Sequence, residues 1–550
     1  MVLSLVLAAC DSSSGKSGTR GIPGNTGPIP NGGTLTIGAE EEPACFDWIG
    51  SCSGLQWGTW IAQIHTQPWA FIDVPDGKGG LKTIASPLLA APATMTPTPV
   101  ETISYKIEPK AVWSDGVQIT CADFQYTVDQ QQNGKDLYDP TGYPDIASVT
   151  CPTPKSVVVK YAKGKTYANW KSLFGAGVGI FPSHLLKGKD RDAELKNGYS
   201  WSGGPWFAKW TKGVSVVLTP NPKYWGQKPH LDKVVFKFEA DTAAEFQAFQ
   251  SGQVQAIYPQ PQIDVVDAIK AGLTGAQHEY NANTASVEAL WFNLTRPPFD
   301  SKPFRQALMY SIDRDAVVKK LFGGLGVDKA VNSLNPPVMA AYSDQNATSY
   351  YTLQPDKVTS LMTGAGWKKG SDGYWAKNGK RASFTVSTTA DNKRRQLTEQ
   401  IMQPLFKAQG FQMKIDNKSV DDLFGKLLPE LNYESAIYGS GLVSLIPGLC
   451  SILCTSAIPT AANGSSGNNT QGVSIPRADK LMATVDESLN DAERRSAAKE
   501  VDKIMADEAV AMPIDPLPDV LIWSDKVVGP IQDNAILGMF WNLNEWGLKQ

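Results

Sequence analysis

Cysteine is the residue type in this chain whose number and spacing point most directly to chemistry. There are seven cysteines, and an odd number leaves one without a partner inside the chain. The other six fall into three local pairs, namely Cys45 with Cys52, Cys121 with Cys151, and Cys450 with Cys454. In an oxidising compartment such pairs close into disulfides. The alternatives are free buried thiols or zinc ligands, but zinc favours CxxC-type spacing with histidines nearby, which this chain lacks.

The seventh cysteine, Cys10, follows the apolar run at the start of the chain. Residues 2–9 are apolar, and Leu7-Ala8-Ala9-Cys10 resembles a bacterial lipobox, in which the cysteine thiol receives a diacylglyceryl group. The sequence departs from that pattern because no Lys or Arg precedes the run. Residues 11–32 are rich in Ser, Gly and Pro, which is typical of a disordered tether. We therefore predict that residues 1–10 are the end of a lipoprotein signal with Cys10 as the lipidated residue. The alternative is a chance buried cysteine.

The remaining reactive residues form no recognisable catalytic or metal-binding set. The four histidines are scattered and show no metal-ligand spacing. The sequence contains neither a nucleophile elbow nor an HExxH motif. The formal net charge is −3, so no basic excess exists to neutralise nucleic-acid phosphates. We therefore predict no metal, no cofactor and no nucleic-acid partner.

Strands and helices alternate along the chain, which predicts an α/β protein. Strand patterns occur at residues 33–38, 102–107, 156–161, 214–218 and 234–238. Thr242 with Glu245 predicts a capping box, and a helix that starts at Pro303 is expected to run to Gly323-Gly324. A length of 550 residues predicts two or three lobes. Beyond the first nine residues no apolar run approaches the ~20 residues that span a bilayer.

Four stretches of the sequence occur in the order and with the spacing of one known family. They are TISYKIEPKAVWSDGVQITCADFQYT at 102–127, a stretch with GGPWF and NPKYWGQKPHLDKVVF at 203–238, NLTRPPFDSKPFRQALMYSIDRDAVV at 293–318, and a late helix pair with its following strand at 476–514. Together they resemble the family 5 extracellular solute-binding proteins of peptide-type bacterial ABC importers. The turn Ser114-Asp115-Gly116 and the cap Thr120 are structural features of the first stretch.

The resemblance implies a two-lobed clamshell like the periplasmic binding proteins of type II, cluster C. Lobe one would comprise residues 33–257 and 513–550, with an extra subdomain at about 61–200. Lobe two would comprise residues 258–512. The chain would cross between the lobes near Tyr258-Pro259 and return near Met512-Pro513.

The resemblance also suggests ligand-binding residues. Peptide-binding relatives often hold the ligand's amino group with an aspartate in a stretch that corresponds to residues 436–448, but no carboxylate lies there. Either the amine is met elsewhere, with Glu40 to Glu42 as candidates, or the ligand has no amine. Arg394 or Arg395 occupies the place of an arginine that holds the ligand's carboxylate, the alternative being a solvated charge cluster. The other expected cleft residues are Trp57, Trp60, Trp291, Tyr438, Gly439, Ser440 and Gly441, and the aromatic ones are alternatively core residues.

The function implied is that of a substrate-binding lipoprotein of an ABC importer. It would be a monomer, tethered to the outer face of the bacterial cytoplasmic membrane, that captures a peptide or similar solute and delivers it to the permease subunits. Because no acid lies in residues 436–448, we expect peptides longer than two residues, or a non-peptide solute, to be preferred over dipeptides. The alternatives are a regulatory lipoprotein of the same fold with a plugged cleft, and an exported glycan-active enzyme that uses two carboxylates.

Overall fold

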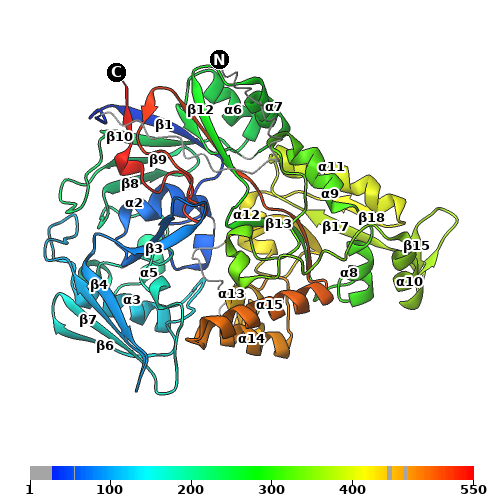
Figure 1. The fold of residues 1–550 in the computed structure, drawn as a ribbon, viewed down its shortest axis with the longest axis horizontal. Helices are drawn as coiled ribbons and strands as arrows, with labels where there is room; N and C mark the ends of the chain where they lie inside the picture. Colours follow the sequence, from blue (N-terminus) through cyan, green and yellow to red (C-terminus); the bar gives the residue numbers. More distant parts are fainter. Residues whose placement is uncertain (1–27, 55, 260, 442–448, 464–466, 550) are drawn as a thin grey trace, which may run out of the picture.

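The computed structural model describes residues 28–549 except 55, 260, 442–448 and 464–466, so Cys10 and its surroundings lie outside the described residues. Two lobes lie side by side, each built on its own mixed sheet (Figure 1). Lobe one contains a seven-stranded sheet. Its order is β12 (Ala276–Asn281), β21 (Asp519–Ser524), β11 (Ala256–Ile257), β1 (Thr34–Ala39), β10 (Lys233–Phe238), β9 (Ser215–Pro220) and β8 (Trp206–Thr211).

The lobe-one sheet forms where apolar residues alternate along the predicted strands. Strand β1 pairs in parallel with β10, with Leu35 opposite Val234 and Ile37 opposite Phe236. These four side chains are fully buried, so this face of the sheet supplies the core of the lobe. The three strands expected at 33–38, 214–218 and 234–238 are confirmed.

A second, four-stranded antiparallel sheet forms a separate layer of lobe one. Its order is β4 (Leu89–Thr96), β5 (Thr102–Ile107), β7 (Ser156–Tyr161) and β6 (Ile146–Thr153). Helix α3 (Cys121–Asn133) packs against it, and its capping box pairs Thr120 with Asp123. The disulfide Cys121–Cys151 joins this helix to β6. The other two predicted disulfides, Cys45–Cys52 and Cys450–Cys454, are also present.

Lobe two is built on a five-stranded sheet flanked by helices (Figure 1). The strand order is β18 (Gln412–Ile415), β17 (Ser383–Ser387), β19 (Ser435–Gly441), β13 (Ser286–Phe292) and β20 (Ala511–Asp515). All seven residues of β13 are buried because this strand lies between β19 and β20. The flanking helices include α8 (Lys302–Met309), α9 (Arg314–Phe322), α10 (Pro355–Gly364), α11 (Lys393–Ala408), α13 (Leu449–Leu453), α14 (Pro476–Glu487) and α15 (Asp491–Asp507).

Two helix predictions differ from the structure in their details. The helix expected from Pro303 to Gly323 is broken after Met309, because the Asp313 side chain accepts a hydrogen bond from the Ala316 amide and starts α9 as a new helix. Likewise the N-cap of α6 (Thr242–Gln250) is Asp241, one residue before the expected cap Thr242, since the Asp241 side chain accepts from the amides of Ala243 and Ala244.

The strand pairing locates the passages between the two sheets. After β11 the chain forms α7 (Ile263–Ala271) and then β12, which pairs with β21 at the edge of the lobe-one sheet. The chain therefore enters the lobe-two sheet at residues 282–285, later than the crossing expected near Tyr258-Pro259. It returns at residues 516–518, just after the expected position near Met512-Pro513. The difference arises because α7 and β12 follow Pro259, and β12 still pairs with β21 in the lobe-one sheet.

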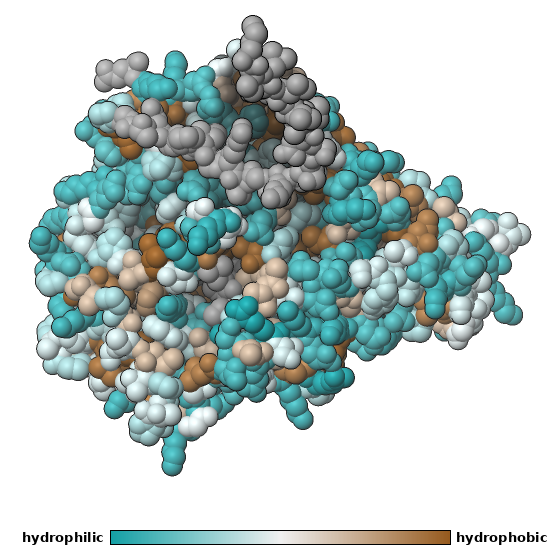
Figure 2. Space-filling view, viewed as in Figure 1, coloured by the Kyte–Doolittle hydropathy of each residue, from teal (hydrophilic) through white to brown (hydrophobic). Residues whose placement is uncertain are grey.

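The face of the molecule seen in Figure 2 is mostly polar. In the space-filling view, hydrophilic residues cover most of the visible face and hydrophobic residues are scattered among them (Figure 2). Within the described part of the chain, none of the helices combines the length and apolar character needed to cross a bilayer. Nor do the described residues contain a group of three His, Cys, Asp or Glu side chains that fits a metal ion.

Candidate functional site

A cavity of about 530 Å³ lies between the two lobes. We call it the interlobe cavity. Most of its wall comes from lobe one, through residues 48–83 and 131–178 and the C-terminal residues Ile536 and Leu537. Lobe two contributes Tyr342, Gly441, Ser451, Ile452 and Asn468. Ligand pockets usually measure roughly 300–1,000 Å³, so the volume suits a small organic solute.

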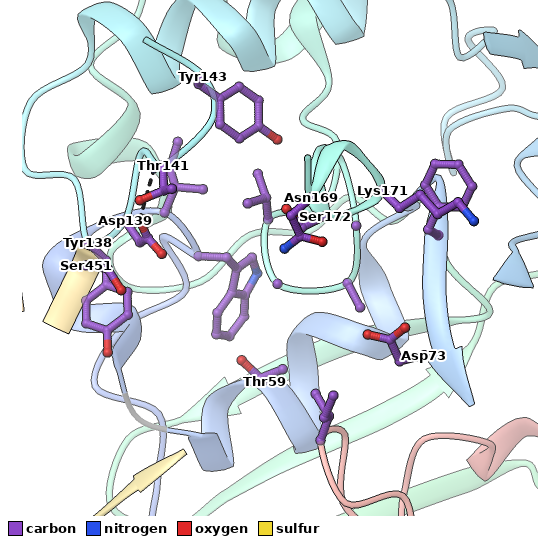
Figure 3. Close-up of a pocket in the computed structure, with 18 of the residues that line it drawn as sticks. Thr59, Asp73, Tyr138, Asp139, Thr141, Tyr143, Asn169, Lys171, Ser172 and Ser451 are labelled. Carbon is purple, nitrogen blue, oxygen red and sulfur yellow. Dashed lines mark hydrogen bonds between the residues drawn. The ribbon is translucent and has the colours of Figure 1, made fainter. Parts of the chain in front are cut away.

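One side of the interlobe cavity carries polar contacts between the lobes. Asp139, Tyr138 and Thr141 of lobe one gather there with Ser451 of lobe two (Figure 3). The Asp139 carboxylate accepts a hydrogen bond from the Thr141 amide, at 3.0 Å, and from the hydroxyl groups of Thr141 and Ser451. Asn468 Nδ2 donates to the Tyr138 hydroxyl at 2.8 Å. Burial raises the pKa of Asp139, and the hydrogen bonds from Thr141 and Ser451 oppose that rise.

The opposite side carries Asn169, Lys171, Ser172 and Asp73 (Figure 3). Lys171 Nζ lies 5.6 Å from the centre of the Trp170 ring, and Asp73 accepts from Thr83 Oγ1 at 2.5 Å. Aromatic rings line much of the remaining wall. They are Trp48, Phe71, Tyr138, Tyr143, Tyr167 and Trp170. Flat apolar faces combined with a few polar groups are typical of a small-molecule site.

The structure places the two predicted arginines beside a buried carboxylate. Arg394 Nη2 donates to Glu288 Oε2 at 2.8 Å, and Arg395 Nε donates to the same oxygen at 3.0 Å. Arg394, Arg395 and Glu288 are 1%, 7% and 0% exposed, so the alternative of a solvated charge cluster is wrong. Burial alone would raise the pKa of Glu288, but the two guanidinium groups outweigh burial and hold it well below its usual range. A ligand-binding role for the arginines remains a prediction.

The expected cleft aromatics lie in hydrophobic cores. Trp57 and Trp60 contact each other and Tyr258 in the lobe-one core. Trp291 stacks on Tyr438 with ring centres 5.4 Å apart, and its indole N–H donates to the Tyr438 carbonyl. These positions fit the core alternative for all four rings.

Among the described residues that line the interlobe cavity, Gly441 is the one that was predicted to bind ligand. A Cβ atom at Gly441 would lie 1.9 Å from Gln56 Nε2 of lobe one, so the missing side chain permits close approach of the lobes. Ser440 and Gly439 precede it in β19, opposite Val287 and Glu288 of β13. Glu40, Glu41 and Glu42, the candidates for meeting an amine, are also absent from the described lining.

Sequence reasoning missed the residues that form the polar sides of the interlobe cavity. Gln131, Tyr138, Asp139, Asn169 and Lys171 all come from lobe one. The stretch LYDPTGYPD at 137–145 holds the only local signal, because it joins tyrosines and aspartates to turn-forming Pro and Gly. Its distance in sequence from the lobe-two residues hides their proximity in space.

Comparisons with known proteins agree with this architecture. The family described as bacterial extracellular solute-binding proteins, family 5 Middle, matches residues 86–445. The oligopeptide-binding protein AppA of Bacillus subtilis is 25% identical over 516 residues, covering 92% of this chain and 89% of AppA. A Brucella ovis protein that carries the name of an ABC transporter peptide-binding protein is 31% identical over 280 residues, or 49% of this chain. The chain thus matches about half the length of that relative, since the aligned region covers 50% of it.

Solved structures share the fold at low sequence identity. A periplasmic EDTA-binding protein, EppA, superposes with a TM-score of 0.82 at 22% identity, covering 95% of this chain and 98% of EppA. AppA of Bacillus subtilis in complex with a nonapeptide superposes with a TM-score of 0.81 at 20% identity, covering 95% of this chain and 100% of AppA. The two-lobed α/β architecture predicted from sequence is confirmed, and the chain belongs to the family 5 bacterial extracellular solute-binding proteins.

Proposed function

We propose that this protein is the substrate-binding component of an ABC importer, which captures a peptide or similar solute between its lobes and delivers it to the permease subunits. The observation that carries the proposal is the interlobe cavity, which is lined from both lobes and has the volume of a small-solute site. The name of AppA, and the nonapeptide in its solved complex, support a peptide as the solute class.

The mechanism is closure of the lobes around the solute. Two hydrogen bonds already cross the cavity, one between Asn468 and Tyr138 and the other between Ser451 and Asp139. A solute that touches both walls adds contact energy to the closed arrangement alone, so it shifts the population toward that arrangement. The closed form then docks on the permease. Binding, closure and release involve no covalent step, so the proposed role is not enzymatic.

The proposal includes a lipid anchor. A diacylglyceryl group on Cys10, followed by the tether of residues 11–32, would hold a monomeric receptor at the outer face of the cytoplasmic membrane, beside its transporter. An open cavity of ligand size also favours solute capture over the alternative of a regulatory lipoprotein with a plugged cleft.

Native mass spectrometry of the protein purified from its own host tests the function. We expect a co-purified solute, released on unfolding, with a mass that matches a peptide. Calorimetric titration with a dipeptide and a pentapeptide then tests the expected preference for peptides longer than two residues. Tight binding of dipeptides alone would contradict that preference, and failure to bind any solute would contradict the transport role.

A further inference from the structure

The interlobe cavity contains a carboxylate, that of Asp139, which has hydrogen bonds but no cationic partner among the described residues. Asp139 accepts from the amide and hydroxyl groups of Thr141 and from the hydroxyl group of Ser451. Among the ion pairs of the described residues, none includes Asp139. Asp139 is half-buried, and a carboxylate partly withdrawn from water without a counter-charge is costly, so a cationic group that arrives with a ligand is stabilised there.

A second acidic residue, from the other lobe, lies close to Asp139. Asp486 of lobe two lies near enough to feel the charge of Asp139, and its backbone carbonyl accepts from the Ala168 amide of lobe one at 2.7 Å. Burial, followed by the charge of Asp139, raises the pKa of Asp486 to about 7, while Arg494 opposes the rise. Arg494 is placed over the Tyr342 ring, with its guanidinium carbon 5.5 Å from the ring centre. Asp486 thus lies close to Asp139 where the lobes meet, and of the two acids Asp139 is the one that lines the cavity.

An independent observation in the same cavity also points to a ligand. Gln131 of α3 lines the cavity and is only 1% exposed. Neither its amide nitrogen nor its amide oxygen has a hydrogen-bond partner among the described residues. A buried side-chain amide without hydrogen-bond partners destabilises the folded protein unless a bound molecule supplies those partners. A peptide group carries the complementary donor and acceptor.

We propose that Asp139 binds the free amino group of the ligand, and that Gln131 binds a peptide group of the same ligand. This inference rests on the proposed function and narrows it to peptides with a free N-terminal amine. The amine is then met from lobe one, which accounts for the lack of an acid in residues 436–448. Because Ser451 of lobe two also contacts Asp139, an ammonium group at this carboxylate links recognition to the closed arrangement.

Competition between free and N-acetylated peptides tests the inference. The full chain is mixed with equal amounts of a random pentapeptide pool and the same pool acetylated at its N-termini, and native mass spectrometry identifies the bound members. We expect the wild-type protein to favour free-amine peptides by at least tenfold, equivalent to about 1.4 kcal/mol. For Asp139→Asn, which keeps an oxygen acceptor but removes the charge, we expect the ratio to fall toward one.

The matched control is Asp129→Asn, which makes the same change on the exposed side of α3. It should keep the wild-type ratio. Equal binding of free and acetylated peptides by the wild-type protein would overturn the inference while leaving peptide capture intact. A tenfold preference that persists in Asp139→Asn would overturn the role of Asp139. If no member of either pool binds the wild-type protein, peptide capture and the inference both fail. Should Asp139→Asn unfold, the wild-type ratio decides whether a free amine is recognised at all, and equal binding of the two pools overturns the inference.

Discussion

Arg394 donates to both carboxylate oxygens of Glu288, with Nη1–Oε1 at 2.5 Å and Nη2–Oε2 at 2.8 Å, and both side chains are fully enclosed in lobe two. Arg395 Nε shares the Oε2 atom at 3.0 Å. The pair joins β13 to the start of α11, so it fixes the helix against the sheet.

We expect Glu288→Ala to destabilise the protein by about 3–5 kcal/mol, because it leaves two buried guanidinium groups without their carboxylate. Urea unfolding of the full chain measures the change. The control is Asp372→Ala, which breaks the half-exposed pair of Asp372 with Arg381 and should cost less than about 1 kcal/mol. Equal losses in the two variants would contradict a structural role for the Glu288 pair.

A buried acid in α11 predicts a pH dependence of stability. Glu399 is 1% exposed, its Oε2 accepts from Asn417, and its Oε1 has no partner among the described residues. Burial raises the pKa of Glu399 to about 7, and the hydrogen bond opposes that rise. Since the folded-state pKa exceeds the unfolded one, this contribution to stability is full below about pH 4.5 and is lost as the pH rises through 7.

Between pH 5 and pH 8, the free energy of unfolding should fall by roughly 2–3 kcal/mol less for Glu399→Gln than for the wild-type protein, because glutamine does not ionise. Urea unfolding at the two pH values gives the comparison. Parallel pH profiles for the two proteins would show that Glu399 is already ionised at pH 5.

The hydrogen bond from Asn468 to Tyr138 predicts a contribution to closure. Tyr138→Phe and Asn468→Ala should each weaken binding of a pentapeptide by roughly 2- to 12-fold, the value of one hydrogen bond of about 0.5–1.5 kcal/mol. Because Tyr138 also lines the cavity, calorimetry of both single variants and the double variant isolates the pair. Strictly additive losses would mean that the two residues act separately.

The three disulfides are expected to differ in their contribution to stability. Cys121–Cys151 closes a loop with a sequence separation of 30, whereas Cys450–Cys454 has a separation of 4. In the chain-entropy account, replacing the first pair by serine should cost roughly 3–4 kcal/mol, and replacing the second roughly 2 kcal/mol. Thermal unfolding of the two double-serine variants ranks them. Peptide mapping without reductant checks the pairing, and a cross-linked Cys52 with Cys121 would contradict it.

The proposed anchor predicts that Cys10→Ala releases the protein from the membrane without unfolding it. The lipobox-like end at Leu7-Ala8-Ala9-Cys10 is the reason, since alanine has no thiol to receive the lipid. Fractionation of cells that produce the full chain is the measurement, with Ser12→Ala in the tether as the control. Retention of Cys10→Ala in the membrane pellet at the wild-type level would contradict the anchor.

Much of the fold follows from local sequence patterns. Alternating apolar residues predicted strands such as β1 and β10, and the Thr120 cap predicted the start of α3. The three disulfides were also predicted, by pairing each cysteine after Cys10 with the next or the preceding cysteine along the chain. Such signals work because strand burial, helix capping and short loop closures depend on residues that are close along the chain. The chain passes between the two sheets at residues 282–285, after the position expected near Tyr258-Pro259, because β12 pairs with β21, a segment far away in the sequence.

The sequence by itself determined the α/β class, the family and the cysteine pairs, whereas only the tertiary structure decided which polar groups face the interlobe cavity. Arg394 looks like a free cation in the sequence, yet folding places it against Glu288 from a distant strand. Asp139 looks like an ordinary loop acid, yet folding brings it to Ser451 of the other lobe. The physical reason is that charge pairing and burial depend on contacts across the chain, which local spacing does not encode.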